Sequence, residues 1–219
     1  MASKADTRKK TVRRLLDEAG DTYAAEAGIT LKDQPAPLWR LLVLSNLLSA
    51  RIGADIAVAA ARELFKAGGG TPKGMAELTW QQRVDALGRG HYVRYDESTA
   101  TRLGECAERV RAEYRGDLRR LPGNKEHDER KLREALQEFK GIGPTGVDIF
   151  CREVQLVWPW LRPYLDKVAL KGAATVDLPD DPERLADLVT GKDMARLAAA
   201  LVRASRDKEV AQAVGASSS

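Results

Sequence analysis

The sequence predicts an all-helical protein, and three observations support this fold class. Apolar residues recur every three or four positions in most segments, which is the period of an amphipathic helix; Leu132, Leu136 and Phe139 are one example. Almost no stretch alternates apolar and polar residues in the way that a half-buried strand does. The composition is rich in alanine, leucine, arginine and glutamate, which favour helices over strands.

The same periodicity, followed along the chain, locates the helices and the breaks between them. Residues 38–50 are apolar nearly all round, which predicts a helix buried in the core. Prolines and glycines within 34–37, 68–72 and 122–124 predict loops, because these residues interrupt helices. We therefore expect helices at 12–26, 38–50, 56–66, 75–78, 80–87, 96–114, 129–139, 145–157, 167–174, 182–189 and 193–210.

Charge and cysteine content limit the class of protein. The 36 lysines and arginines exceed the 32 acidic residues and give a net charge of +4, which allows a polyanionic partner without requiring one. The only two cysteines, Cys106 and Cys151, favour a reducing compartment and no disulfide framework. No stretch reaches the roughly 20 apolar residues that cross a bilayer, and no secretory signal is evident. We expect a cytoplasmic monomer that makes no membrane contact.

A basic arm precedes the first expected helix. Residues 4–14 contain six lysines and arginines against the single acidic residue Asp6. Such an arm is either a frayed, solvated terminus or a segment that contacts phosphate groups. The sequence leaves both readings open.

The most informative segment contains Gly141-Ile142-Gly143-Pro144 between two apolar helices. Glycine permits a tight turn, and proline suits the first position of a new helix, where its missing N–H donor would have no partner. Backbone N–H groups and the positive end of the second helix would then face a phosphate, with Ile142 anchored in the core and Lys140 adding a charge. We call residues 140–143 the hairpin. The alternative is a plain helical connection with a glycine cap.

At this point the sequence resembles the helix–hairpin–helix superfamily of DNA glycosylases, which includes the endonuclease III-like base-excision repair enzymes. The resemblance covers about 37–173 and rests on short stretches that occur in the family's order. These are Leu47-Leu48-Ser49-Ala50 at the end of a core helix, Gly90-His91-Tyr92 before a long helix, Lys140-Gly141-Ile142-Gly143 in the hairpin, Leu165-Asp166 some twenty residues downstream, and Lys171.

The resemblance implies an enzyme that flips a nucleotide out of double-stranded DNA and breaks its glycosidic bond. Asp166 falls where the family carries its catalytic aspartate, which would either activate water or stabilise the positively charged sugar as the base departs. The alternative role of Asp166 is to cap the following helix. Lys171 falls at a basic, DNA-contacting position. Thr145 stands where bifunctional members have a lysine nucleophile, so we expect no lyase activity unless Lys140 or Lys167 supplies it.

The resemblance also bears on cofactors and domains. Many relatives carry an iron–sulfur cluster that needs four thiolates. This sequence has two cysteines in all, so we expect no cluster, and in this respect it is similar to the cluster-free 3-methyladenine glycosylases. No cysteines, histidines and carboxylates have the spacing of a metal site, although a monovalent cation on the hairpin carbonyls is implied. We expect two helical lobes: a barrel at 37–153, and a second domain formed by 1–36 with 154–219.

Substrate recognition is less clearly encoded. Arg51 lies near the position where relatives insert a side chain into the gap left by the flipped base, and otherwise is an ordinary exposed arginine. Trp39, His91 and Tyr92 are candidates for stacking on a base, with core packing as the alternative for Trp39.

Two functions from different classes therefore remain. The first is a monofunctional DNA glycosylase acting on cationic alkylpurines or on mismatched uracil or thymine. The second is a non-catalytic helix–hairpin–helix module that recognises bent or damaged DNA.

Overall fold

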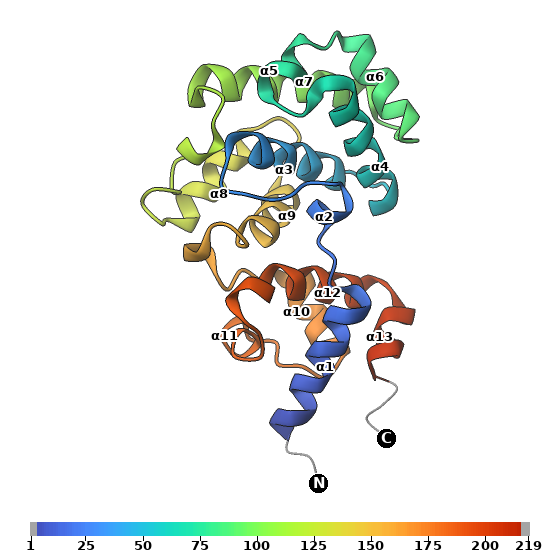
Figure 1. The fold of residues 1–219 in the computed structure, drawn as a ribbon, viewed down its shortest axis with the longest axis vertical. Helices are drawn as coiled ribbons and strands as arrows, with labels where there is room; N and C mark the ends of the chain where they lie inside the picture. Colours follow the sequence, from blue (N-terminus) through green and yellow to red (C-terminus); the bar gives the residue numbers. More distant parts are fainter. Residues whose placement is uncertain (1–3, 216–219) are drawn as a thin grey trace. The chain divides into compact units, whose positions relative to one another are not determined.

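Figure 1 shows the computed structural model of the protein, which describes residues 4–215. Helices joined by loops make up this range, and it contains no strand, which confirms the predicted fold class. It forms two compact units. The central unit is Ala24–Phe150, and the terminal unit joins the chain up to Tyr23 with the chain from Cys151 onward.

The central unit is built around one buried helix, α3 (Pro35–Leu48). Leucines cover α3 on every side and are almost fully buried, as expected for a helix that is apolar all round. The other elements of this unit are α4 (Ala54–Leu64), η1 (Phe65–Gly69), α5 (Pro72–Glu77), α6 (Trp80–Arg89), α7 (Asp96–Tyr114), η2 (Leu118–Arg120), α8 (Glu129–Gln137) and the first part of α9 (Pro144–Val154), after the short α2 (Tyr23–Glu26).

The terminal unit has its own core between α1 (Lys4–Ala19), α10 (Lys167–Thr175) and α12 (Met194–Arg206). The two helices α10 and α12 approach so closely that a Cβ atom on Gly172 would lie 1.8 Å from the Leu201 carbonyl oxygen, which only glycine avoids. The remaining elements are η3 (Pro159–Leu161), α11 (Pro182–Ala186), η4 (Gly191–Asp193) and α13 (Lys208–Gly215).

Several boundaries differ from those expected. The helix expected at 12–26 is divided into α1 and α2, and the helices expected at 129–139, 145–157 and 182–189 end at Gln137, Val154 and Ala186. The basic arm is not a separate segment, because α1 begins at Lys4 and includes it. The helix expected at 193–210 is interrupted at Asp207, whose backbone is extended and whose carboxylate accepts the N–H of Glu209. The first boundary between the units lies after Tyr23 and not at 36, so the segment leading into α3 belongs to the central unit. Among the described residues, no helix is long and apolar enough to span a membrane.

Candidate functional site

The hairpin joins the end of α8 to the start of α9 by a tight turn. Gly141 has a φ of +85°, and a Cβ atom there would lie 2.7 Å from Nδ2 of Asn46, so glycine is required on both counts. The Ile142 N–H donates to the Phe139 carbonyl oxygen at 3.0 Å. The Ile142 side chain is 3% exposed and fastens the turn to the core, as the sequence predicted.

The second half of the hairpin presents backbone donors. Gly143 precedes α9, and its carbonyl accepts the first helical hydrogen bond, from Val147 N–H at 3.0 Å. Pro144 has no N–H, and the N–H groups of Gly143, Thr145 and Gly146 meet no acceptor among residues 4–215. Gly143 and Thr145 are exposed. These donors lie at the positive end of α9, a geometry that suits a phosphate.

Buried polar groups of α3 and α7 support the hairpin from within the central unit. The Lys140 carbonyl accepts Asn46 Nδ2 at 2.7 Å and the Cys106 thiol at 3.4 Å. A Cβ atom on Gly146 would lie 2.6 Å from Ser49 Oγ, so α9 also begins close against the end of α3. The contacts of Asn46 and Cys106 with the hairpin were not predicted. For Asn46 there was a signal, since a polar residue within a helix that is apolar nearly all round indicates an internal partner.

The hairpin carbonyls bear on the expected monovalent cation. The Lys140 carbonyl already accepts two donors, which excludes it as a ligand. Within the described part of the chain, no hydrogen bond reaches the carbonyls of Gly141 and Ile142. The cation remains a prediction for these two oxygens.

Cys106 yields a test of the packing behind the hairpin. Burial raises the pKa of its thiol to about 12, mainly because a thiolate would lose its hydration. The thiol therefore stays protonated well above the pH at which an unfolded cysteine ionises. We expect iodoacetamide at about pH 8.5 to modify Cys106 at least a hundredfold more slowly in the native protein than in urea. Peptide mass spectrometry would separate it from Cys151, and rapid native labelling of Cys106 would contradict the packing.

Asp166 lies in the terminal unit, where two hydrogen bonds hold its carboxylate. Oδ1 accepts the Ala169 N–H at 3.2 Å and so caps α10. Oδ2 accepts Arg152 Nη1 at 2.6 Å in an ion pair whose side chains are each only 7% exposed. The capping role is therefore confirmed. The arginine partner, fourteen residues earlier in the chain, was not anticipated.

The segment before Asp166 is fastened to the end of α9. The Gln155 side chain accepts the Tyr164 N–H at 3.0 Å and donates to the Tyr164 carbonyl at 2.9 Å. Arg162 donates to the carbonyls of Gln155 and Leu156, each at 2.6 Å. Arg152, in the last turn of α9, and Gln155, just after that helix, are buried polar residues in a mainly apolar stretch, the same signal that marks Asn46.

The other expected site residues are distributed over both units. Lys140 and Thr145 are exposed at the hairpin. Arg51 is exposed in the bend that follows α3, two residues after Ser49, and thus at the hairpin end of that helix. Lys167 and Lys171 are exposed on α10 in the terminal unit.

Two of the three proposed stacking residues require correction. Trp39 is 0% exposed, and its indole N–H donates to the Gly69 carbonyl at 3.0 Å, so it is a core residue with no free ring face. Tyr92 is 1% exposed and equally unable to stack on a base. The turn that carries His91 and Tyr92 is shaped by packing, since a Cβ atom on Gly90 would meet the backbone of Ala60 at 2.4 Å. His91 alone is exposed, with a φ of +63°.

This all-helical architecture with its hairpin is similar to that of two solved structures. One is a trapped covalent intermediate of endonuclease III with DNA, at a TM-score of 0.49, and the other a non-covalent endonuclease III–DNA complex, at 0.51. Each is 14% identical to the chain and is matched over 93% of this chain and 86% of its own. The sequence matches no family model, and no curated protein is significantly similar to it. The chain thus has the endonuclease III-like fold.

Proposed function

We propose that the protein is a monofunctional DNA glycosylase that removes a damaged or mismatched base from double-stranded DNA. The observation that carries this proposal is the exposed end of the hairpin and start of α9, where the N–H groups of Gly143 and Thr145 are open to a phosphate. The endonuclease III-like fold supports it. The cytoplasmic location, the monomeric state and the absence of an iron–sulfur cluster remain parts of the proposal.

In this proposal Asp166 stabilises the positive charge that develops on the sugar as the base leaves. Its carboxylate is already held at both oxygens, and each oxygen keeps a second lone pair for a substrate or a water molecule. A fixed carboxylate needs no reorganisation during the reaction, which is the condition for effective electrostatic stabilisation. Lys171 and Arg51 would add contacts to the DNA.

One observation favours the second candidate, a non-catalytic DNA-binding module. The guanidinium of Arg152 offsets the charge of Asp166 in a buried pair, which weakens the attraction of that carboxylate for a cationic sugar. Under this alternative Asp166 and Arg152 only hold the segment before α10 in place. The hairpin would then bind DNA without any chemistry.

Base release separates the two candidates. Duplexes that each carry one lesion or mismatch are incubated with the protein, and abasic sites are then cleaved with alkali. The panel includes alkylated purines and mispaired uracil and thymine. Release from one or more duplexes establishes the enzyme, whereas binding without release across the whole panel establishes the module.

Thr145 predicts the outcome of a trapping experiment. Its hydroxyl cannot form an imine with the sugar, so borohydride should trap no covalent adduct between the protein and an abasic duplex. The Thr145→Lys variant supplies an amine at the same exposed position and serves as the comparison. An adduct with the unmodified protein would contradict the monofunctional assignment. It would make Lys140 and Lys167 the candidate nucleophiles.

Gly143 offers a test of the phosphate contact that leaves the fold intact. No atom lies within 4 Å of a Cβ atom at this position, and its φ is not in the left-handed region. We expect Gly143→Leu to weaken binding about tenfold to a hundredfold on every duplex sequence, because a side chain would separate the open N–H groups from the phosphate. Affinity is measured by fluorescence polarisation on unrelated sequences.

Gly88→Leu is the matched control for this variant, since Gly88 also has open space around its Cβ position but lies on α6. Its DNA affinity should stay unchanged. A sequence-dependent loss in Gly143→Leu would mean that the hairpin reads bases, and no loss would remove the hairpin from the interface.

A further inference from the structure

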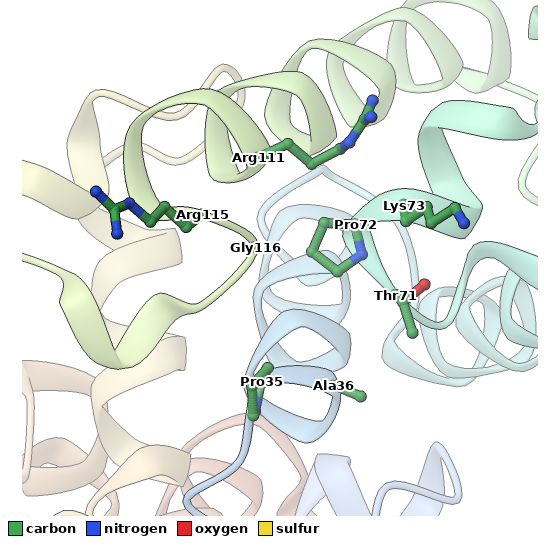
Figure 2. Close-up of a pocket in the computed structure, with 8 residues that line it drawn as sticks. All are labelled: Pro35, Ala36, Thr71, Pro72, Lys73, Arg111, Arg115 and Gly116. Carbon is green, nitrogen blue, oxygen red and sulfur yellow. The ribbon is translucent and has the colours of Figure 1, made fainter.

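A pocket of about 610 Å³ lies in the central unit between the first turns of α3 and α5 and the end of α7. Figure 2 shows its lining, with Pro72 at the centre and Pro35 and Ala36 beneath it on α3. This volume is within the range of pockets that bind ligands. Neither proposed function uses the pocket.

The apolar centre is bordered by positive charge. Lys73, Arg111 and Arg115 all line the pocket, and no carboxylate does. In Figure 2 the side chains of Arg115 and Lys73 extend on opposite sides of Pro72. Lys73 and Arg111 pair with Glu77 and Glu108 of their own helices, at 3.7 and 3.1 Å. Exposed ion pairs of this kind are weak, so both cations can still attract an anionic ligand.

Arg115 stands out among these cations. It ends α7 in a left-handed backbone conformation, with a φ of +53°, which is strained for any residue with a side chain. No ion pair forms at Arg115 within the described part of the chain. Its charge is therefore available to a ligand.

The pocket is separate from the hairpin. Pro35 and Ala36 form the first turn of α3, whereas the hairpin region packs against Ser49 at the other end of the same helix. The 14 residues of α3 place about 20 Å between these ends. A ligand of the pocket is thus distinct from the phosphate at the hairpin.

We propose that this pocket binds an acidic peptide segment of a partner protein, with one apolar side chain inserted beside Pro72 and carboxylates facing Lys73, Arg111 and Arg115. Charge complementarity favours an anionic ligand. The apolar centre favours an apolar side chain over a phosphate, because Pro35, Ala36 and Pro72 offer no side-chain donor. Thr71 is the one uncharged polar side chain of the lining, and its hydroxyl oxygen accepts the Gly74 N–H at the start of α5. A duplex is too wide to enter the pocket, so DNA would contact only the bordering cations.

The test uses an array of fluorescein-labelled, aspartate-rich peptides in which one leucine, phenylalanine or tryptophan occupies each position in turn. We expect saturable binding of at least one peptide to the full chain, weakened by salt. Replacing its apolar residue by serine should reduce affinity about tenfold. If no peptide binds, or if the serine version binds equally well, the proposal is overturned.

Two variants test whether the peptide binds in this pocket. Arg115→Gly removes a charge and relieves the backbone strain, so its melting temperature should not fall while peptide affinity falls about tenfold. Ala36→Glu places an acidic side chain in the first turn of α3, which suits the helix but repels the peptide. Arg94→Gly, an exposed arginine in a loop, is the control and should bind as the unmodified protein does.

The last experiment compares the affinity of Arg115→Gly for duplex DNA with its affinity for the peptide. If Arg115→Gly lowers duplex affinity as much as peptide affinity, and the duplex displaces the peptide, the surface is part of the nucleic-acid interface and the proposal fails. Base release does not depend on this pocket, so a failure here leaves the proposed glycosylase activity untouched.

Discussion

Replacing Asp166 by asparagine should slow base release strongly while DNA binding survives. Asparagine keeps the size of the side chain and still caps α10, since it is among the preferred capping residues. It removes the negative charge that would stabilise the sugar cation. It also leaves the buried Arg152 guanidinium without its charged partner, so the melting temperature should fall as well. We expect the single-turnover rate of base release to fall at least about a hundredfold.

Asp181→Asn is the matched control. Asp181 caps α11 with a hydrogen bond from the Arg184 N–H at 2.8 Å, so the same change is made at another helix cap in the same unit, one that is exposed and outside the Arg152 pair. Base release should be unaffected there. A normal rate in Asp166→Asn, with folding verified by melting temperature, would exclude this carboxylate from the chemistry.

Arg152→Met should cost about 3–5 kcal/mol of unfolding free energy. Methionine fills much of the same volume, but it leaves the Asp166 carboxylate buried without its charged partner. Urea unfolding followed by circular dichroism measures the loss. In contrast, Arg130→Met removes one member of an exposed pair with Glu134 and should cost no more than about 1 kcal/mol.

The double variant Arg152→Met with Asp166→Asn sharpens this result. Removing the second charge as well should recover part of the stability, because no uncompensated carboxylate remains. A double variant less stable than Arg152→Met alone, or a single variant that loses less than about 1 kcal/mol, would show that the pair contributes little.

Local signals in the sequence were sufficient to predict the helices and the hairpin. Glycine, proline and an apolar residue within a few positions determine that turn, and it lies where it was expected. Helix periodicity likewise predicted the buried α3. The start of α1 was missed, because charged residues on a solvated helix show no apolar period until Val12.

The partners of the candidate site could not be predicted in this way. The contact between Arg152 and Asp166 depends on how the chain folds back after η3, which no local pattern encodes. Trp39 and Tyr92 show the converse problem. An aromatic ring suits a core and a stacking surface equally well, and only the burial seen in the structure decides between them.

The clamp of Gln155 on Tyr164 has a consequence for how the carboxylate would act. Both backbone groups of Tyr164, two residues before Asp166, are bonded to the side chain of Gln155, which directly follows α9. This stretch therefore loses its conformational freedom during folding and not when a ligand arrives. Binding energy is then not diverted into ordering the chain. Preorganisation of this kind lets even a weakly held substrate meet a carboxylate that is already in position.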